Sequence, residues 1–348
     1  MTAAQPDELR YADPSMARPP TAQVIQNQGR HNRDVGMTVV RGGPDPRRLL
    51  RSPSRWILLL AERSCGIGLL QWAGRAGRMR SHRTGLSMTD GYTYDHAWTL
   101  ERARLAGLEA ALDPGTREHL TRLGASPGKR CLEVGAGGGS VACWLAQRVA
   151  PGGTVVATDL ETDFLESESA SHFGLQVLRH DITAEELPSG FDIVHARWLV
   201  EWLPDKPLAL RRMVDALRPG GVLLIEEPDF VTIYGAGDPP ALRHVMLAAM
   251  RHLESTCSVE VEYGRRAMGD LRTVGLLDVH AEGRCPIVAG GSPLAADFLR
   301  LTIEKLRAPV LAGGAVTERE YDQAVAALQD PSITVVAPMT VAAWGTRP

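Results

Sequence analysis

The chain has 348 residues, 44% of them hydrophobic and 23% charged, a composition typical of a globular protein and not of a disordered or membrane-spanning one. Its five cysteines are scattered without a C-x-x-C pair, which argues against a disulfide scaffold or a zinc site and predicts a cytoplasmic location. The formal net charge of -3 hides a division, because residues 1–87 carry +8 and residues 88–348 carry -11. An acidic second part repels phosphate, so we expect no nucleic-acid partner.

Residues 1–87, here called the leader, contain 14 arginines, no lysine and no sustained hydrophobic periodicity. Their apolar run, 56–72, is interrupted by Glu62 and Arg63, so it is too short and too charged to span a membrane. Three interpretations stay open: a targeting segment, a basic arm for nucleic acid or membrane surfaces, or upstream sequence that is not translated. We favour the third, with Met88 as the start of the protein, and expect the leader to be disordered.

Two amphipathic helices are predicted after the leader, over 95–112 and 114–123, within an N-terminal helical segment that spans 88–128. Tyr92 and Tyr94 precede them and either close over a ligand or pack on the core. No internal repeat follows, so we expect residues 88–348 to form one domain.

A glycine-rich turn follows the first predicted strand. The apolar run Cys131-Leu-Glu-Val134 leads into Gly135-Ala-Gly-Gly-Gly-Ser140, and a helix is predicted to begin at Ser140. The next strand ends in Asp159. Glycine permits positive φ and close approach of a ligand to the backbone, and Asp159 could accept hydrogen bonds from both ribose hydroxyls. The pattern therefore predicts a nucleoside-binding α/β unit.

Further strands are predicted over 175–182, 191–195 and 217–227, which completes a core at 129–227. An excursion at 228–262 contains an apolar helix over 242–250. The C-terminal part, 263–348, contains a helix over 265–274, a strand over 278–283, a helical pair near 294–328 and a last strand over 333–344. The order predicts an α/β fold with a doubly wound, seven-stranded, mostly parallel sheet and one antiparallel edge strand.

The spacing Glu133-x-Gly135-x-Gly137-x-Gly139 differs from a dinucleotide fingerprint, which needs glycine at position 140, where this chain has serine. This motif, together with Leu217-Arg-Pro-Gly-Gly221 before the fifth strand, resembles class I S-adenosylmethionine-dependent methyltransferases over about residues 90–345. The likeness is strongest to the ubiquinone/menaquinone and secondary-metabolite enzymes of that family. It implies a Rossmann-like fold, S-adenosylmethionine as cofactor and methyl transfer to a small, apolar or aromatic metabolite.

The resemblance also assigns candidate cofactor residues. It implies that Glu133, Gly135 and Gly137 line the methionine end and that Asp159 binds the ribose diol. The remaining cofactor candidates are Leu160 beside the adenine, Asp181 and Ile182 at the adenine edge, and Arg197. Asp181 could equally cap the turn that follows it.

Candidate catalytic residues follow strands four and five. His195, Glu227 and Asp229 should face the transferred methyl group, and any of them could act as a general base. Such a base is needed only when the acceptor loses a proton; otherwise alignment suffices. Trp198, Trp202, Phe230 and Tyr234 are available to hold an apolar acceptor.

Two alternatives stay open: an NAD-dependent oxidoreductase on a similar fold, and a catalytically silent cofactor-binding protein. We expect no metal, no membrane partner, and a small-molecule substrate. A homo-oligomer is compatible with the sequence.

Overall fold

The computed structural model describes residues 98–169, 173–234 and 239–348, all within one compact unit, Ser81–Pro348. The predictions for the leader, for its boundary at Met88, and for Tyr92 and Tyr94 lie outside the described residues. None of the described helices is both long and apolar enough to cross a membrane.

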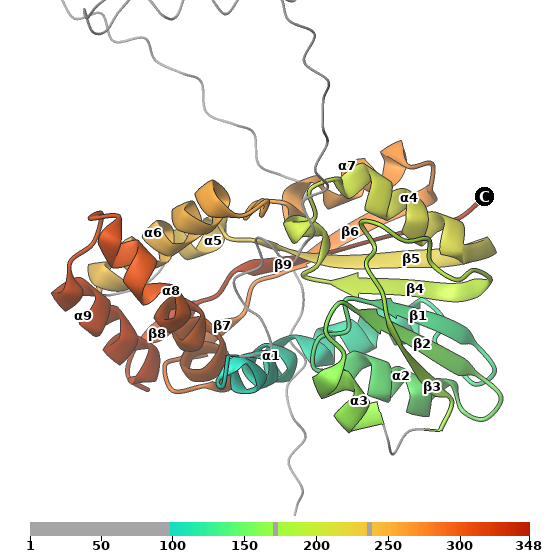
Figure 1. The fold of residues 1–348 in the computed structure, drawn as a ribbon, viewed down its shortest axis with the longest axis horizontal. Helices are drawn as coiled ribbons and strands as arrows, with labels where there is room; N and C mark the ends of the chain where they lie inside the picture. Colours follow the sequence, from blue (N-terminus) through green and yellow to red (C-terminus); the bar gives the residue numbers. More distant parts are fainter. Residues whose placement is uncertain (1–97, 170–172, 235–238) are drawn as a thin grey trace, which may run out of the picture. The chain divides into compact units, whose positions relative to one another are not determined.

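A seven-stranded sheet forms the centre of this unit, in the order β3-β2-β1-β4-β5-β9-β6 (Figure 1). Its strands are β1 Arg130–Val134, β2 Thr154–Asp159, β3 Leu175–Arg179, β4 Phe191–Arg197, β5 Leu217–Asp229, β6 Leu277–Arg284 and β9 Met339–Thr346. The order reverses between β1 and β4, and ligands bind at such a point, beyond the carboxyl ends of the strands. The predicted α/β class and strand number are confirmed.

The antiparallel strand is not at the edge, contrary to the prediction. β9 runs antiparallel to both β5 and β6 and lies between them, so β6 is the edge strand. The cause is burial: Val341, Ala342 and Ala343 of β9 are buried, whereas most of β6 is exposed or half-buried. A strand that is apolar on both faces is typical of the interior of a sheet, where it has a neighbouring strand along each edge.

Helices cover both faces of the sheet (Figure 1). α2 Ser140–Val149 and α3 Asp163–Ser169 lie on one face; α4 Lys206–Ala216 and α7 Gly264–Thr273 lie on the other. Each face has its own apolar core, with Val141 and Leu145 packed on the first and Leu210, Met213 and Leu271 on the second. α2 begins at Ser140, as predicted, and α7 corresponds to the helix predicted over 265–274.

The two helices predicted near the N-terminus are one helix, α1 Glu101–Arg122, with Pro114 inside it. Proline removes a backbone donor and normally breaks a helix. Here side chains on both sides of the proline are tied to other elements: Asp113 pairs with Arg197 and Thr116 hydrogen-bonds to Glu226. These tertiary contacts hold one continuous helix across the break that the local sequence favours.

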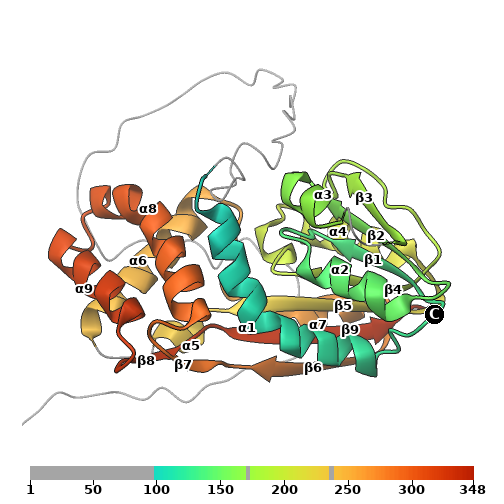
Figure 2. The same cartoon turned by 90° about the horizontal axis from the view of Figure 1, so that it is seen from below.

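A second group of helices, here called the cap, lies beyond the carboxyl ends of the strands (Figures 1 and 2). It comprises α5 Val231–Tyr234, α6 Pro240–Thr256, a π-helical segment Pro293–Leu299, α8 Arg300–Ala312 and α9 Glu318–Gln329. Its core is separate from those of the sheet and contains Val245, Met246 and Ile303. The predicted excursion after strand five is therefore one part of a larger helical layer.

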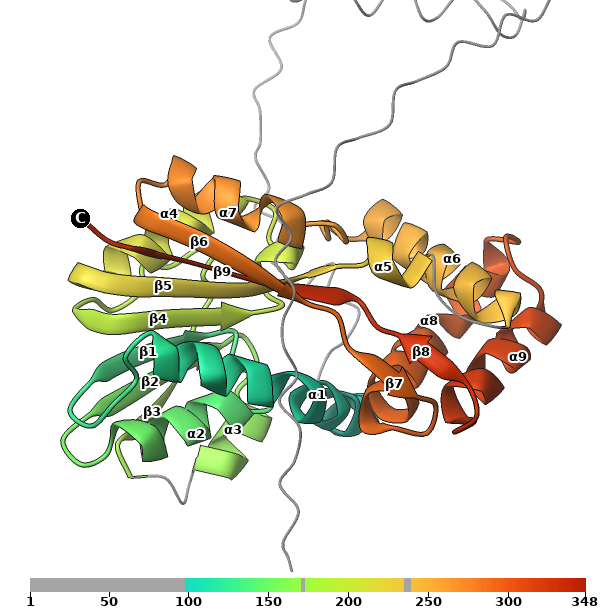
Figure 3. The same cartoon turned by 180° about the vertical axis from the view of Figure 1, so that it is seen from behind.

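The last predicted strand, 333–344, is also divided. β8 Thr334–Val336 pairs with β7 Ile287–Ala289 in a separate two-stranded sheet beside the cap, and β9 begins only at Met339 (Figure 3). Pro338 lies in the break. Because proline has no backbone N–H to donate to a ladder, a continuous strand across this position is disfavoured.

Candidate active site

The glycine-rich turn joins β1 to α2 with backbone angles that suit glycine. Gly135, Gly137 and Gly139 have φ of +71°, +54° and +89°. A Cβ on Gly137 would meet only Leu105, at 3.8 Å, so the backbone there borders open space. Asp159 holds the turn, because its Oδ2 accepts a hydrogen bond from the N–H of Gly137 at 2.8 Å. The turn and the carboxylate at the end of β2 thus form one unit.

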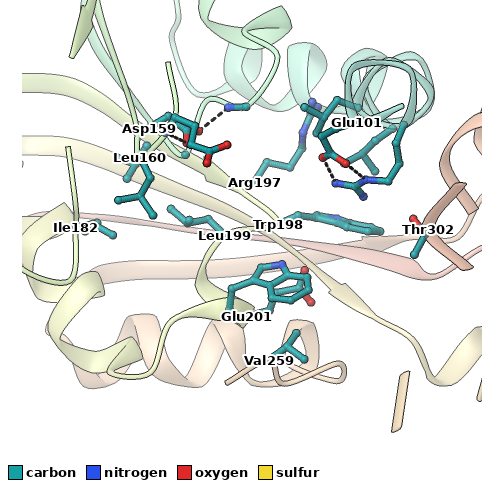
Figure 4. Close-up of a pocket in the computed structure, with 18 of the residues that line it drawn as sticks. Glu101, Asp159, Leu160, Ile182, Arg197, Trp198, Leu199, Glu201, Val259 and Thr302 are labelled. Carbon is teal, nitrogen blue, oxygen red and sulfur yellow. Dashed lines mark hydrogen bonds and ion pairs between the residues drawn. The ribbon is translucent and has the colours of Figure 1, made fainter. Parts of the chain in front are cut away.

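A cavity of about 230 Å³ extends from this turn to the cap. The predicted residues Gly135, Gly137, Asp159, Leu160, Asp181, Ile182 and Arg197 all line it. Figure 4 shows Asp159, Leu160 and Ile182 together at one end, with Glu101, Trp198 and Thr302 toward the other. Asp181 Oδ1 also accepts hydrogen bonds from the backbone and hydroxyl of Thr183, at 2.8 and 2.6 Å, so it holds the following turn as well.

Glu133 and His195 do not line the cavity; they are buried in the sheet beside it. His195 Nδ1 lies 2.7 Å from Glu133 Oε2, and its Nε2 lies 3.3 Å from Glu226 Oε2. Burial alone would lower the pKa of His195, but the two carboxylates outweigh it and raise the pKa to about 9. An imidazole that is already protonated near neutral pH cannot accept a proton from a substrate.

The same ionic cluster continues to α1. Glu226 Oε1 lies 2.6 Å from His119 Nδ1, and His119 Nε2 lies 2.5 Å from Glu282 on β6. Although burial opposes it, hydrogen bonding to the two histidines keeps the pKa of Glu226 below its ordinary value. The cluster joins β1, β4, β5 and β6 to the C-terminal half of α1, and it therefore positions the helix that borders the cavity.

Glu227 and Asp229 have structural partners too, and neither lines the cavity. Glu227 accepts backbone hydrogen bonds from Val200 and Glu201, both at 3.0 Å, and burial raises its pKa to about 7. Asp229 accepts two hydrogen bonds from Arg265, both at 2.9 Å. The structure thus brings none of the three predicted catalytic side chains to the cavity wall.

The cap end of the cavity is mainly apolar. Trp198 contacts Phe230 and Phe298 edge-on, with ring centroids 5.7 and 5.3 Å apart. Trp202, Met250 and Leu253 complete this wall. Trp198 has φ of +53°, an uncommon backbone conformation for a bulky residue, which its setting between β4 and the next turn imposes. The side chain of Tyr234 lies outside the described residues.

Charged groups interrupt the apolar wall at three places. Arg104 donates two hydrogen bonds to Glu101, at 2.8 and 2.6 Å, and Arg197 donates to Asp113 at 2.9 Å. Each of these arginines is therefore paired with a carboxylate. The third place is Glu201, on the short 3-10 helix Val200–Trp202, which is 1% exposed.

Several of these groups had no sequence prediction. Glu201 lies between the predicted Trp198 and Trp202, so its place after a strand end could have drawn attention to it. Phe298 and Thr302 come from the C-terminal helices, about a hundred residues away in the sequence, and no local motif marks them.

Comparison with known protein families gives a match within the sheet. A family model described as a methyltransferase domain matches residues 132–225, the stretch from β1 to the middle of β5. This stretch holds the glycine turn, Asp159 and Asp181. Residues 132–225 therefore form a methyltransferase domain. S-adenosylmethionine is the cofactor of such a domain.

Individual methyltransferases match part of the chain. Trans-aconitate 2-methyltransferase of Deinococcus radiodurans is 35% identical over 103 residues, 29% of this chain and 39% of the relative. Nocamycin O-methyltransferase of Saccharothrix syringae is 33% identical over 159 residues, 42% and 54% of the two chains. Methyltransferase str2 of Strobilurus tenacellus is 27% identical over 172 residues, 48% and 60%. The chain thus spans about half the length of these relatives, and the cap falls largely outside the family match.

Proposed function

We propose that this protein transfers a methyl group from S-adenosylmethionine to a small, uncharged and largely apolar metabolite. One observation carries the proposal: a single cavity joins the glycine turn and Asp159 at one end to an aromatic wall at the other. A cofactor and an acceptor bound in that cavity would be neighbours, as group transfer requires.

The cofactor end fits S-adenosylmethionine. Asp159 offers a carboxylate for the ribose hydroxyls, and Gly137 leaves room for the methionine part beside Gly135, which packs against Leu199. Leu160 and Ile182 offer apolar contacts for the adenine. When bound, the sulfonium supplies a methyl carbon that is already electrophilic, and the electron pair of its bond to sulfur stays on sulfur. The residues of this chain have to bind, orient and exclude water.

The acceptor end selects by shape and polarity. The rings of Trp198, Phe230 and Phe298 offer faces and edges for a flat apolar molecule. Because both lining arginines are paired with carboxylates, this end has little attraction for an anionic acceptor. Small apolar pockets with few polar groups typically bind small molecules in this manner.

Calorimetric titration of the full chain tests the proposal against the oxidoreductase alternative. We expect S-adenosylmethionine and S-adenosylhomocysteine to bind and NADH to leave no measurable heat. Binding of NADH in preference to both would contradict the proposal. Binding without turnover on any acceptor would favour the catalytically silent alternative.

A further inference from the structure

One carboxylate at the acceptor end has an oxygen without a protein partner. Glu201 lines the cavity and is 1% exposed, and its Oε2 has no hydrogen-bond partner among the described residues. Burying a polar atom without a partner destabilises a protein, so a buried carboxylate oxygen is normally satisfied. Because Glu201 lines the cavity, we infer that a ligand bound there supplies the missing partner.

The surroundings of Glu201 explain why the protein leaves this oxygen to a ligand. Its other contacts are structural: the Trp202 side chain hydrogen-bonds to it, and its backbone N–H donates to Glu227 at 3.0 Å. Lys206, the nearest lysine, donates to the carbonyl of Leu203 at 3.0 Å and lies 4.0 Å from Glu260. Arg104 is held by Glu101. No cation of the described residues hydrogen-bonds to the second oxygen.

These contacts define the complementary ligand. Once Glu201 is ionised, a group that faces its carboxylate must donate a hydrogen bond, and a second carboxylate there would be repelled. The rest of the wall is aromatic and aliphatic, so the remainder of the ligand is apolar. A hydroxyl on a flat ring meets both requirements.

We propose that Glu201 Oε2 accepts a hydrogen bond from the hydroxyl of an uncharged aromatic acceptor and takes its proton when that hydroxyl is methylated. This proposal rests on the proposed function. The O–H bond breaks, its electron pair forms the bond from oxygen to the incoming methyl carbon, and the proton moves to Oε2. The product is a neutral methyl ether, which has no proton left to donate.

The charges around Glu201 and Glu227 support the role of Glu201 as a base. Burial, followed by repulsion from Glu227, raises the pKa of Glu201 well above its ordinary value. Lys206 and Arg104 oppose that shift. Tyr263 lies near Glu227 but carries no positive charge, so it does not offset the repulsion between the two carboxyl groups. A carboxylate with a raised pKa is a stronger base than an exposed one, so it is better matched to a weakly acidic hydroxyl.

Binding of matched naphthalene probes tests the proposal. The full chain, saturated with S-adenosylhomocysteine, would be titrated with 2-naphthol, 2-methoxynaphthalene and 2-naphthoate. We expect 2-naphthol to bind at least about 10-fold more tightly than the other two, because only it donates to Glu201 without carrying a charge. In Glu201→Leu that preference should vanish, while the affinity for 2-methoxynaphthalene stays within about 3-fold.

The Gln variant separates binding from proton acceptance. Glu201→Gln keeps an oxygen that can accept a hydrogen bond, so 2-naphthol should still bind, but methylation of 2-naphthol should fall by at least about 100-fold, since general-base catalysis typically contributes that much. The wild-type rate should rise with pH to a plateau, and the residual rate of the variant should lose this limb. Glu254→Gln, on the exposed side of α6, is the matched control and should behave as wild type.

Three results would overturn the proposal: equal wild-type affinities for 2-naphthol and its methyl ether, failure of 2-naphthol to bind while S-adenosylhomocysteine binds, or unchanged methylation in Glu201→Gln. Failure of S-adenosylhomocysteine itself to bind the wild type would instead contradict the proposed function. Unchanged binding of S-adenosylhomocysteine to both variants shows that they are folded.

Discussion

At the scale of single residues, the charged groups around the acceptor end divide into those that are paired within the protein and Glu201, which keeps one oxygen without a partner among the described residues. His195, Glu227 and Asp229 lie near the carboxyl ends of β4 and β5, where catalytic groups are often found, which is why the sequence favoured them. Each is satisfied by protein neighbours instead. Position along a strand can be predicted from the sequence, but the direction and partners of a side chain depend on elements far away in the chain.

Glu201→Gln should stabilise the protein. The substitution replaces a buried carboxyl whose raised pKa costs stability once it ionises, so the free energy of unfolding should rise by about 1–2 kcal/mol at pH 8. For a carboxyl with a raised folded pKa, stability falls as the pH rises above the unfolded value, so the gain should be smaller at pH 5. Urea titrations at the two pH values measure this. A loss of stability at pH 8, with Glu254→Gln unchanged, would argue against the buried, unsatisfied state of Glu201.

His195 should make stability fall in mildly alkaline solution. Its folded pKa of about 9 exceeds the ordinary value of 6.5, so its contribution is complete below about pH 6.5 and is lost as the pH rises through 9. The shift corresponds to about 3 kcal/mol at most. His195→Gln should be less stable at pH 6.5 and show a flatter pH profile, whereas His252→Gln on α6 should keep the wild-type slope. A wild-type unfolding free energy that is constant from pH 6.5 to 9 would refute the charged assignment.

At the scale of elements, α1 connects the sheet to the cap. Its C-terminal half is tied to the sheet through His119 and Thr116, and its N-terminal half packs on the π-helical segment of the cap (Figure 2). Glu101, Arg104 and Leu108 of that half line the cavity. The position of α1 therefore determines the width of the acceptor end.

At Gly107, α1 approaches the backbone of the π-helical segment closely. A Cβ there would lie 2.7 Å from Phe298 N and Pro293 O, both backbone atoms that cannot move aside easily. Gly107→Ala should therefore lower stability by about 1–3 kcal/mol, the usual cost of overpacking, and weaken binding of 2-naphthol. Gly269→Ala in α7 has nothing within 4 Å of its Cβ and should raise stability by roughly 0.5–1 kcal/mol. Thermal denaturation of both variants measures the two changes in stability. Equal effects would contradict close packing at Gly107.

At the scale of the whole molecule, the two ends of the cavity differ in how far the sequence predicts them. The cofactor end comes from one stretch, 131–182, in which strand, turn and carboxylate follow each other at βα spacing, so the motif alone indicates the site. The acceptor end joins α1, the turn after β4, α6 and the π-helical segment. Those contacts are set by tertiary packing, which overrode local signals at Pro114 and placed β9 inside the sheet.

The effect of the leader, residues 1–87, on stability and cofactor binding also concerns the whole molecule. If Met88 is the start of the protein, residues 88–348 alone should match the full chain in melting temperature and in affinity for S-adenosylmethionine. Differential scanning calorimetry and titration calorimetry measure the two quantities. A clearly lower melting temperature for the shorter chain would show that the leader contributes to the folded protein.

The affinity of the Asp159 variant for S-adenosylmethionine tests the central claim most directly. Asp159→Ala removes the charged acceptor proposed for the ribose, and hydrogen bonds to charged groups contribute roughly 1.5–3 kcal/mol each, so the dissociation constant should rise by about 10-fold or more. Asp163→Ala, at an exposed position at the start of α3, should leave it unchanged. Titration calorimetry that shows wild-type affinity in Asp159→Ala, with the fold intact by circular dichroism, would contradict the assignment of this cavity to the cofactor.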